Sequence, residues 1–173
     1  MAPTAPRNPA TPPEHPAAPE QPASPEQPAP PLRRVLVIGG GRIGAALARR
    51  LTASEHLVTV VEPDPERARE LAVLLPGVEV VAGDGTEVAV LERAGIHDVE
   101  VVAAVTGDDP CNLAVTALAR HGFAVPRTIA RIVDPAHAWL FHTATGVDVA
   151  VDQADLLSRL IVEEMGPDDG GPP

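Results

Sequence analysis

Three glycines with GxGxxG spacing, Gly39, Gly41 and Gly44, follow the apolar run 35–38 and open a helical pattern. In this motif the first glycine permits a tight turn, and the second lets a pyrophosphate approach the backbone. The third lets the helix and the strand pack closely. The helix N-terminus then offers unpaired N–H groups and a positive dipole end to phosphates. The glycines therefore predict a phosphate-binding turn.

An acid, Glu62, closes a second apolar run at 57–61, eighteen residues beyond Gly44. At this spacing a carboxylate accepts both ribose hydroxyls of an adenosine and repels a 2′-phosphate. The pair of features favours NAD or NADH, or an adenine nucleotide such as ATP or ADP, over NADP. The alternative is a tight strand-to-helix turn that binds no ligand.

The elements that must position these residues follow from the pattern beyond Arg33, where short Val-rich runs alternate with helical patterns. This alternation is typical of a parallel sheet with crossover helices. We expect strands near 33–38, 57–61, 78–82, 100–105, 128–132 and 147–151, and helices near 42–53, 64–75, 87–94, 110–121, 135–144 and 153–164.

Right-handed crossovers then give a Rossmann-like, doubly wound α/β fold whose six parallel strands have the order 3-2-1-4-5-6. Ligands of such sheets bind at the carboxyl ends of the strands, where the strand order reverses. We therefore expect a crevice beside Gly39 to Gly44.

Local helix starts support these bounds. Asp64, Asp109 and Asp134 each precede a proline, which favours an N-capping carboxylate followed by proline in the first turn. Thr86 is expected to cap a helix that begins at Glu87.

Residues at or just beyond the ends of the predicted strands are the candidate ligand contacts. They are Gly41, Arg42 and Ile43 after the first strand, Glu62 after the second, Asp84 and Thr86 after the third, Thr106 and Asp108 after the fourth, and Arg131 in the fifth. Asp84 either accepts from an adenine amino group or stabilises a turn. Arg42 either pairs with a phosphate or is solvated. Arg131 either reaches a phosphate or forms a salt bridge to Asp134 or Glu100.

The two ends of the chain differ from this pattern. Residues 1–31 hold twelve of the twenty-one prolines and few aliphatic residues, so we expect a disordered or polyproline-like segment. The folded domain is expected over 32–165, with a second short tail at 166–173. A proline-rich recognition role for the first segment is the alternative.

Composition excludes several functions. A net charge of −11 argues against a nucleic-acid surface, and no apolar run approaches the length of about 18 residues that crosses a bilayer. All thirteen basic residues are arginine and there is no tyrosine, so a Tyr-Lys pair or a Schiff-base lysine is unavailable. The histidines and the single cysteine, Cys111, show no metal-ligand spacing. We expect a soluble cytoplasmic protein without a metal site.

Several motifs also resemble one family. GGGRIG and the segments 62–67, 83–86, 106–112 and 130–135 are similar, in this order, to the nucleotide-binding domain of TrkA-type potassium-uptake regulators. That domain is also called the regulator-of-potassium-conductance domain, and the similarity runs from about Val35 to Leu160. The resemblance implies a cytoplasmic domain that senses NAD(H) or ATP/ADP, gates a membrane potassium channel or transporter, and pairs into a homodimer or a higher ring.

The resemblance also implies a role for each matching residue. Gly39, Gly41 and Gly44 would hold the phosphates, Glu62 the ribose and Asp84 the adenine. Arg42 would approach the outer phosphates, and Thr106 and Asp108 would complete the wall of the pocket. Many relatives carry a second ligand-binding domain, so effector sensing is expected in the nucleotide pocket or on another chain.

Two functions compete. The first is a non-catalytic regulatory subunit, and the second is an NAD-dependent oxidoreductase, which needs an acid or base near the nicotinamide. His137 and His142 remain for that task, but their spacing of five puts them off a common helical face. We therefore expect no catalytic residue. A scaffold that has lost its ligand is a third reading, against which the intact glycines and Glu62 count.

Overall fold

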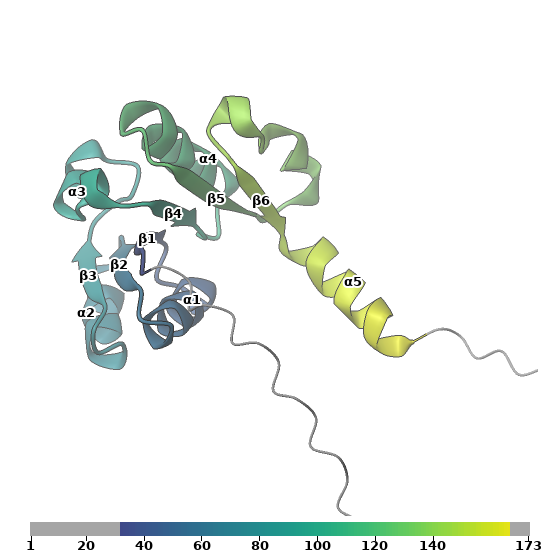
Figure 1. Ribbon diagram of the computed structural model, residues 1–173, viewed down its shortest axis with the longest axis horizontal. Helices are drawn as coiled ribbons and strands as arrows, with labels where there is room; N and C mark the ends of the chain where they lie inside the picture. The colour runs from purple at the N-terminus through teal and green to yellow at the C-terminus, as the bar shows by residue number, and fades with distance from the viewer. Residues whose placement is uncertain (1–31, 167–173) are drawn as a thin grey trace, which may run out of the picture. The chain divides into compact units, whose positions relative to one another are not determined.

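The computed structural model describes residues 32–166 (Figure 1). The predicted disordered segment 1–31 lies outside the described residues, as do residues 167–173 of the predicted tail. Within the described part, no helix is long and apolar enough to cross a membrane.

Six parallel strands form one sheet with the order β3-β2-β1-β4-β5-β6, which confirms the predicted topology. They are β1 (Arg34–Ile38), β2 (Leu57–Glu62), β3 (Glu79–Ala82), β4 (Val101–Ala104), β5 (Arg127–Ile132) and β6 (Val149–Asp152). Every residue of β4 is buried, as expected for a central strand that helices cover on both faces.

Helices cover both faces of this sheet, and the alternation of β1 side chains shows which helix covers which face. The covering helices are α1 (Arg42–Ala53), α2 (Pro65–Leu74), α3 (Val88–Arg93) and α4 (Asp109–Ala117), and a fifth helix, α5 (Gln153–Met165), follows β6. Val35 and Val37 pack in a core cluster with residues of α1 and α2. Leu36 and Ile38 point to the opposite face and pack with residues of α3 and α4.

The predicted helix at 135–144 is wrong. Two short 3₁₀ segments, Pro135–Leu140 and Thr143–Thr145, replace it. Between them the buried ring of Phe141 anchors the chain in a small core cluster, and the Thr145 hydroxyl donates to the Leu140 carbonyl over 2.6 Å. These contacts hold the segment in place without a continuous helix. The predicted helix at 110–121 is present, but only Asp109–Ala117 is α-helical. The chain continues from there as a wider π turn at Leu118–Gly122.

Two of the predicted caps are also wrong. Asp64 and Asp134 cap as expected, with backbone N–H groups of Glu66 and Ala136 donating to them over 2.9 Å. At α4, however, Asp108 accepts from the Cys111 N–H, so Asp109 is free for other contacts. At α3 the N-cap is Glu87 rather than Thr86, because Thr86 bonds to Asp84 instead.

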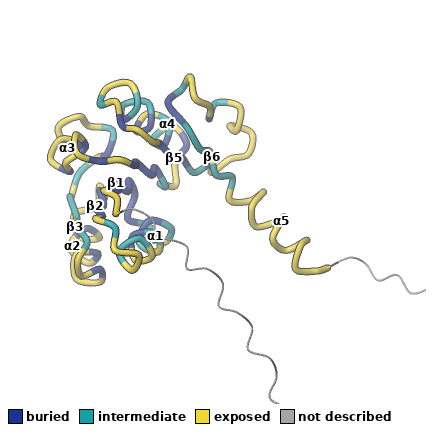
Figure 2. Tube along the Cα trace, in the orientation of Figure 1, coloured by how far each residue is buried: buried dark blue, intermediate teal, exposed yellow. Residues whose placement is uncertain are grey.

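The last helix, α5, begins directly after β6, where Asp152 accepts from the N–H groups of Ala154 and Asp155. None of its residues is buried, and Figure 2 shows the helix as exposed along its length. Its exposed large apolar residues are Leu156, Leu157, Leu160, Ile161, Val162 and Met165.

The glycine turn between β1 and α1 generates the first prediction. A Cβ at Gly44 would overlap the carbonyl oxygen of Gly39, which is backbone and cannot move aside, whereas a Cβ at Gly41 would meet no atom within 4 Å. We expect Gly44→Ala to lower the free energy of unfolding by about 2–3 kcal/mol. Gly41→Ala should lower it by no more than about 1 kcal/mol, since glycine is a better N-cap than alanine. Urea denaturation measures both, and equal losses would contradict the packing role of Gly44.

Candidate functional site

One cavity of about 670 Å³ lies at the carboxyl ends of the strands, where the strand order reverses between β1 and β4. Nine of the eleven candidate residues line it, and Gly44 and Thr86 do not. The cavity is lined by Ile38, Gly39, Gly41, Arg42, Ile43, Glu62, Pro63, Arg67, Asp84, Gly85, Val105, Thr106, Gly107, Asp108, Cys111, Arg131 and Gln153.

The glycine turn forms the floor of this cavity. Gly39 has a φ of +102°, a conformation that favours glycine, and its N–H donates to the Val61 carbonyl over 2.9 Å. Gly44 lies behind the turn, where its missing side chain lets α1 approach Gly39. Gly41 is the N-cap of α1 and has open space where a side chain would be. The turn therefore leaves room for a ligand at the start of α1, as the GxGxxG pattern predicts.

Glu62 both lines the cavity and holds the turn. It is 7 % exposed, and its Oε2 accepts from the Gly40 N–H over 2.7 Å while its Oε1 accepts from the Asp64 N–H over 3.1 Å. Each carboxylate oxygen can accept a second hydrogen bond, so the group keeps its capacity for ribose hydroxyls. The sequence pattern indicates the ribose role and gives no sign of the bracing role.

Asp84 enters the cavity as an exposed carboxylate on the loop after β3. The backbone N–H and the hydroxyl of Thr86 each donate to it over 2.8 Å, and these bonds lower the pKa of Asp84. Thr86 thus orients Asp84 from outside the cavity. The two readings of Asp84, a cavity acceptor and a turn stabiliser, are compatible.

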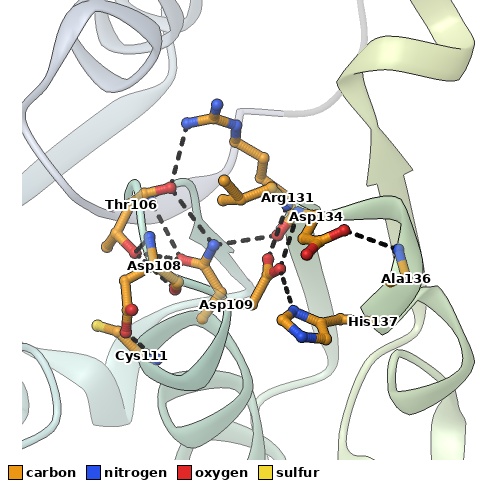
Figure 3. A network of polar contacts seen from close by, with 10 residues as sticks. Thr106, Asp108, Asp109, Cys111, Arg131, Asp134, Ala136 and His137 are labelled. Carbon is orange, nitrogen blue, oxygen red and sulfur yellow. Dashed lines mark hydrogen bonds and ion pairs between the residues drawn. The ribbon is translucent and has the colours of Figure 1, made fainter.

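Hydrogen bonds among Thr106, Asn112 and Arg131 join the ends of β4 and β5 to α4 and form the opposite wall. Figure 3 shows Thr106 and Arg131 within this network. The backbone N–H and the hydroxyl of Thr106 donate to Asn112 Oδ1 over 3.0 and 2.7 Å. Asn112 Nδ2 donates to the Arg131 carbonyl over 3.0 Å, and Arg131 Nη1 donates to the Thr106 carbonyl over 3.2 Å. Since Asn112 is fully buried, this wall is held rigidly.

Arg131 carries a donor that the described residues leave unused. Its Nε is buried and has no hydrogen-bond partner among residues 32–166. The ion pair to Asp134 or Glu100 that was the alternative reading is not formed in this part of the chain. A buried unsatisfied donor of this kind costs about 1–3 kcal/mol.

Three lining residues with polar side chains were missed by sequence reasoning: Arg67, Cys111 and Gln153. Arg67 lies in the first turn of α2, three residues after the Asp64 cap, and that position was the available signal. Cys111 lies in the first turn of α4, where burial raises the pKa of its thiol. Gln153 follows β6 at the sheet edge, which no motif marks.

Asp109 ties α4 to the segment after β5. Its carboxylate is 4 % exposed and accepts from the N–H groups of Val133 and Asp134 over 2.7 and 2.9 Å, and His137 Nδ1 lies 2.9 Å from it. Burial alone raises the pKa of Asp109, but these bonds outweigh it and the net pKa is lowered. The bond to Asp109 raises the pKa of His137.

This pair predicts a pH dependence of stability. Because the pKa of His137 is raised in the folded chain, its stabilisation is fully present below its ordinary pKa of 6.5 and is lost as pH rises through the folded value. We expect the difference in unfolding free energy between the native chain and His137→Gln to be larger at about pH 5.5 than at about pH 8.5. Urea denaturation at both pH values checks this, and a pH-independent difference would contradict the pairing.

The sequence-family model of the TrkA-N domain matches residues 35–153 of this chain. The Trk system potassium uptake protein TrkA of Mycobacterium tuberculosis (strain CDC 1551 / Oshkosh) is 39 % identical over 130 residues, which are 75 % of this chain and 58 % of that protein. A TrkA homolog of Pyrococcus horikoshii is 36 % identical over 131 residues, 73 % of this chain and 57 % of the homolog. The chain thus spans a little over half the length of these relatives.

Solved structures show the same fold. The TrkA-N domain of the inner membrane protein ybaL from Escherichia coli has a TM-score of 0.68 at 24 % identity, over 78 % of this chain and 97 % of that one. The GsuK channel bound to NAD has a TM-score of 0.65 at 24 % identity, over 78 % of this chain and 24 % of that one. The AMP-bound Kef C-terminal domain of Shewanella denitrificans has a TM-score of 0.63 at 22 % identity, over 76 % of this chain and 79 % of that one.

The family model covers the sheet from Val35 onward, the glycine turn and every residue that lines the cavity. The chain therefore belongs to the TrkA-N domain family.

Proposed function

We propose that this chain is a nucleotide-binding regulatory domain for potassium transport. In this account it binds NAD(H) or an adenine nucleotide in the cavity and thereby controls a membrane potassium channel or transporter. The single observation that carries the proposal is the open position of Gly41 at the start of α1, beside the buried carboxylate of Glu62. Backbone N–H donors for a phosphate and a carboxylate acceptor for a ribose thus lie in one cavity.

Each half of the cavity has its own part of the ligand to hold. Glu62 ends β2 and Asp84 follows β3, and they supply acceptors for the ribose and the adenine amino group. The glycine turn and Ile43 receive the phosphates, with Arg42 supplying a cation at the start of α1. Thr106, Asp108 and Arg131 form the wall beyond them.

The ligand class has support from two structures of similar fold, the GsuK channel bound to NAD and the AMP-bound Kef C-terminal domain. Adenosine and at least one phosphate are common to both ligands, and they match the Glu62 side of the cavity and the glycine turn. NAD or NADH and ATP or ADP remain the candidate ligands. Arg42 and Arg131 favour a ligand with further phosphate or carbonyl oxygens beyond the first phosphate.

The partner follows from the names of the relatives, which are Trk system potassium uptake proteins. We infer a cytoplasmic domain that contacts a membrane potassium channel or transporter and pairs as a homodimer or a higher ring. The exposed apolar residues of α5 support a protein partner, because a large exposed apolar patch is unusual on a monomer.

The competing oxidoreductase finds little support in the cavity. His137 bonds to Asp109 outside the cavity, and the lining residues from the described part of the chain include no histidine, tyrosine or lysine. The Cys111 thiol is kept protonated by burial. A hydride transfer would lack an acid or base beside the nicotinamide.

The decisive variant is Gly41→Asp. Aspartate is a good N-cap, and a Cβ at this position meets no atom within 4 Å, so the fold should be unchanged, but its charge would face the phosphates. We expect affinity for NADH or ATP, measured by calorimetry, to fall at least about a hundredfold. Val88→Asp is the matched control, since it adds the same charge at the first residue of α3, outside the cavity. Unchanged binding by Gly41→Asp, or steady consumption of NADH by the native chain, would overturn the proposal.

A further inference from the structure

The cavity offers a nucleotide base no aromatic side chain on which to stack. The whole chain holds two phenylalanines, one tryptophan and no tyrosine. Phe123, Phe141 and Trp139 all lie outside the set of residues that line the cavity. Bases are commonly bound by stacking their faces on flat side chains, either aromatic rings or the guanidinium of arginine. An adenine bound beyond Glu62 therefore needs a guanidinium to cover its face.

Arg67 is the arginine of the cavity that lies on the adenosine side. It is the third residue of α2, which begins just after Glu62 and packs on β2 and β3. Its side chain lines the cavity and is exposed, and its guanidinium forms no ion pair with a carboxylate of residues 32–166. The other arginines of the cavity, Arg42 and Arg131, lie at the start of α1 and in β5.

Arg67 and Asp84 approach the end of the β2–β3 pair from opposite faces of the sheet. Glu62 is paired with Ala82 in the parallel register, and the Gly83 N–H donates to the Glu62 carbonyl over 3.0 Å. Helix α2, which carries Arg67, packs in the core cluster on one face of the sheet, and α3, which follows Asp84, packs in the cluster on the other. A flat ring above this strand pair would thus lie between the two side chains.

The chemistry of the neighbouring groups favours a base over a phosphate as the partner of Arg67. The phosphates of the ligand are assigned to the glycine turn, which leads from β1 into α1. The buried carboxylate of Glu62 repels a phosphate on the ribose hydroxyls. A guanidinium is flat and delocalised, and it stacks on the face of an aromatic ring. Adenine fits both sides, because its amino group can donate to Asp84 while its face meets Arg67.

We propose that Arg67 covers the face of the adenine while Asp84 accepts from its amino edge, so that Arg67 makes the cavity selective for a ligand that carries this base. Arg67 is a specificity-determining residue in this account. Its role rests on the proposed nucleotide-binding function. The same contact serves NADH, ATP, ADP and AMP, since all four contain adenine.

AMP and ribose 5-phosphate test this role because they differ only in the base. Titration of the full chain labelled with ¹⁵N-glycine gives the Kd of each ligand from the amide signals of Gly39 and Gly41. We expect Arg67→Gln to weaken AMP binding about tenfold and to leave ribose 5-phosphate binding within about twofold. Arg69→Gln is the matched control, since it removes the same charge from an exposed residue of α2 outside the cavity. Equal losses for the two ligands would assign Arg67 to the phosphate and overturn the proposal.

The side chain itself gives a second readout. In the chain labelled with ¹³C-arginine, AMP should move the δ-methylene proton signals of Arg67 upfield through the ring current of the base, and ribose 5-phosphate should not. The spectrum of Arg67→Gln identifies the signal. An Arg67 signal that stays in place at saturating AMP would overturn the stacking. If the native chain binds neither AMP nor ATP, the proposed function itself fails, whereas AMP binding that ignores Arg67→Gln overturns this role alone.

Discussion

The approach of Gly44 to the carbonyl of Gly39 is the constraint on which the rest of the site depends. It places the start of α1 directly against the end of β1, so that the free N–H groups of the helix face the carboxyl edge of the sheet. The bond from the Gly40 N–H to Glu62 then fixes the same turn against β2. Two neighbouring strands and one helix N-terminus are thereby held at one point.

The other wall of the cavity is built by a different device. Two side chains from α4, Asn112 and Asp109, are buried and bond to backbone groups at the ends of β4 and β5. These bonds satisfy loop N–H groups that would otherwise be unpaired in a buried setting. They also hold Arg131 beside Thr106, so the cation is positioned before any ligand arrives. A preorganised wall of this kind lowers the cost of binding.

Sequence patterns predicted the sheet well because alternation and glycine spacing are local signals of strands and crossovers. The strand order followed from handedness alone, and nine candidate residues line one cavity. The roles of Asp109, Thr86 and Gln153 were not predicted. They depend on partners that lie far away in the chain, or on which of two neighbouring residues caps a helix. The helix predicted after Asp134 is absent for a similar reason, because burial of Phe141 in a core cluster overrides the local helical pattern.

The central claim, that the glycine turn holds a nucleotide, is tested most directly by NMR of the chain labelled with ¹⁵N-glycine. Addition of ATP or NADH should shift the amide signals of Gly39, Gly41 and Gly107, which line the cavity. Gly77 and Gly95, which lie at the opposite end of the strands beside Arg34 and Leu57, should stay unshifted. Signals of Gly39 and Gly41 that remain unchanged at saturating nucleotide would contradict the account.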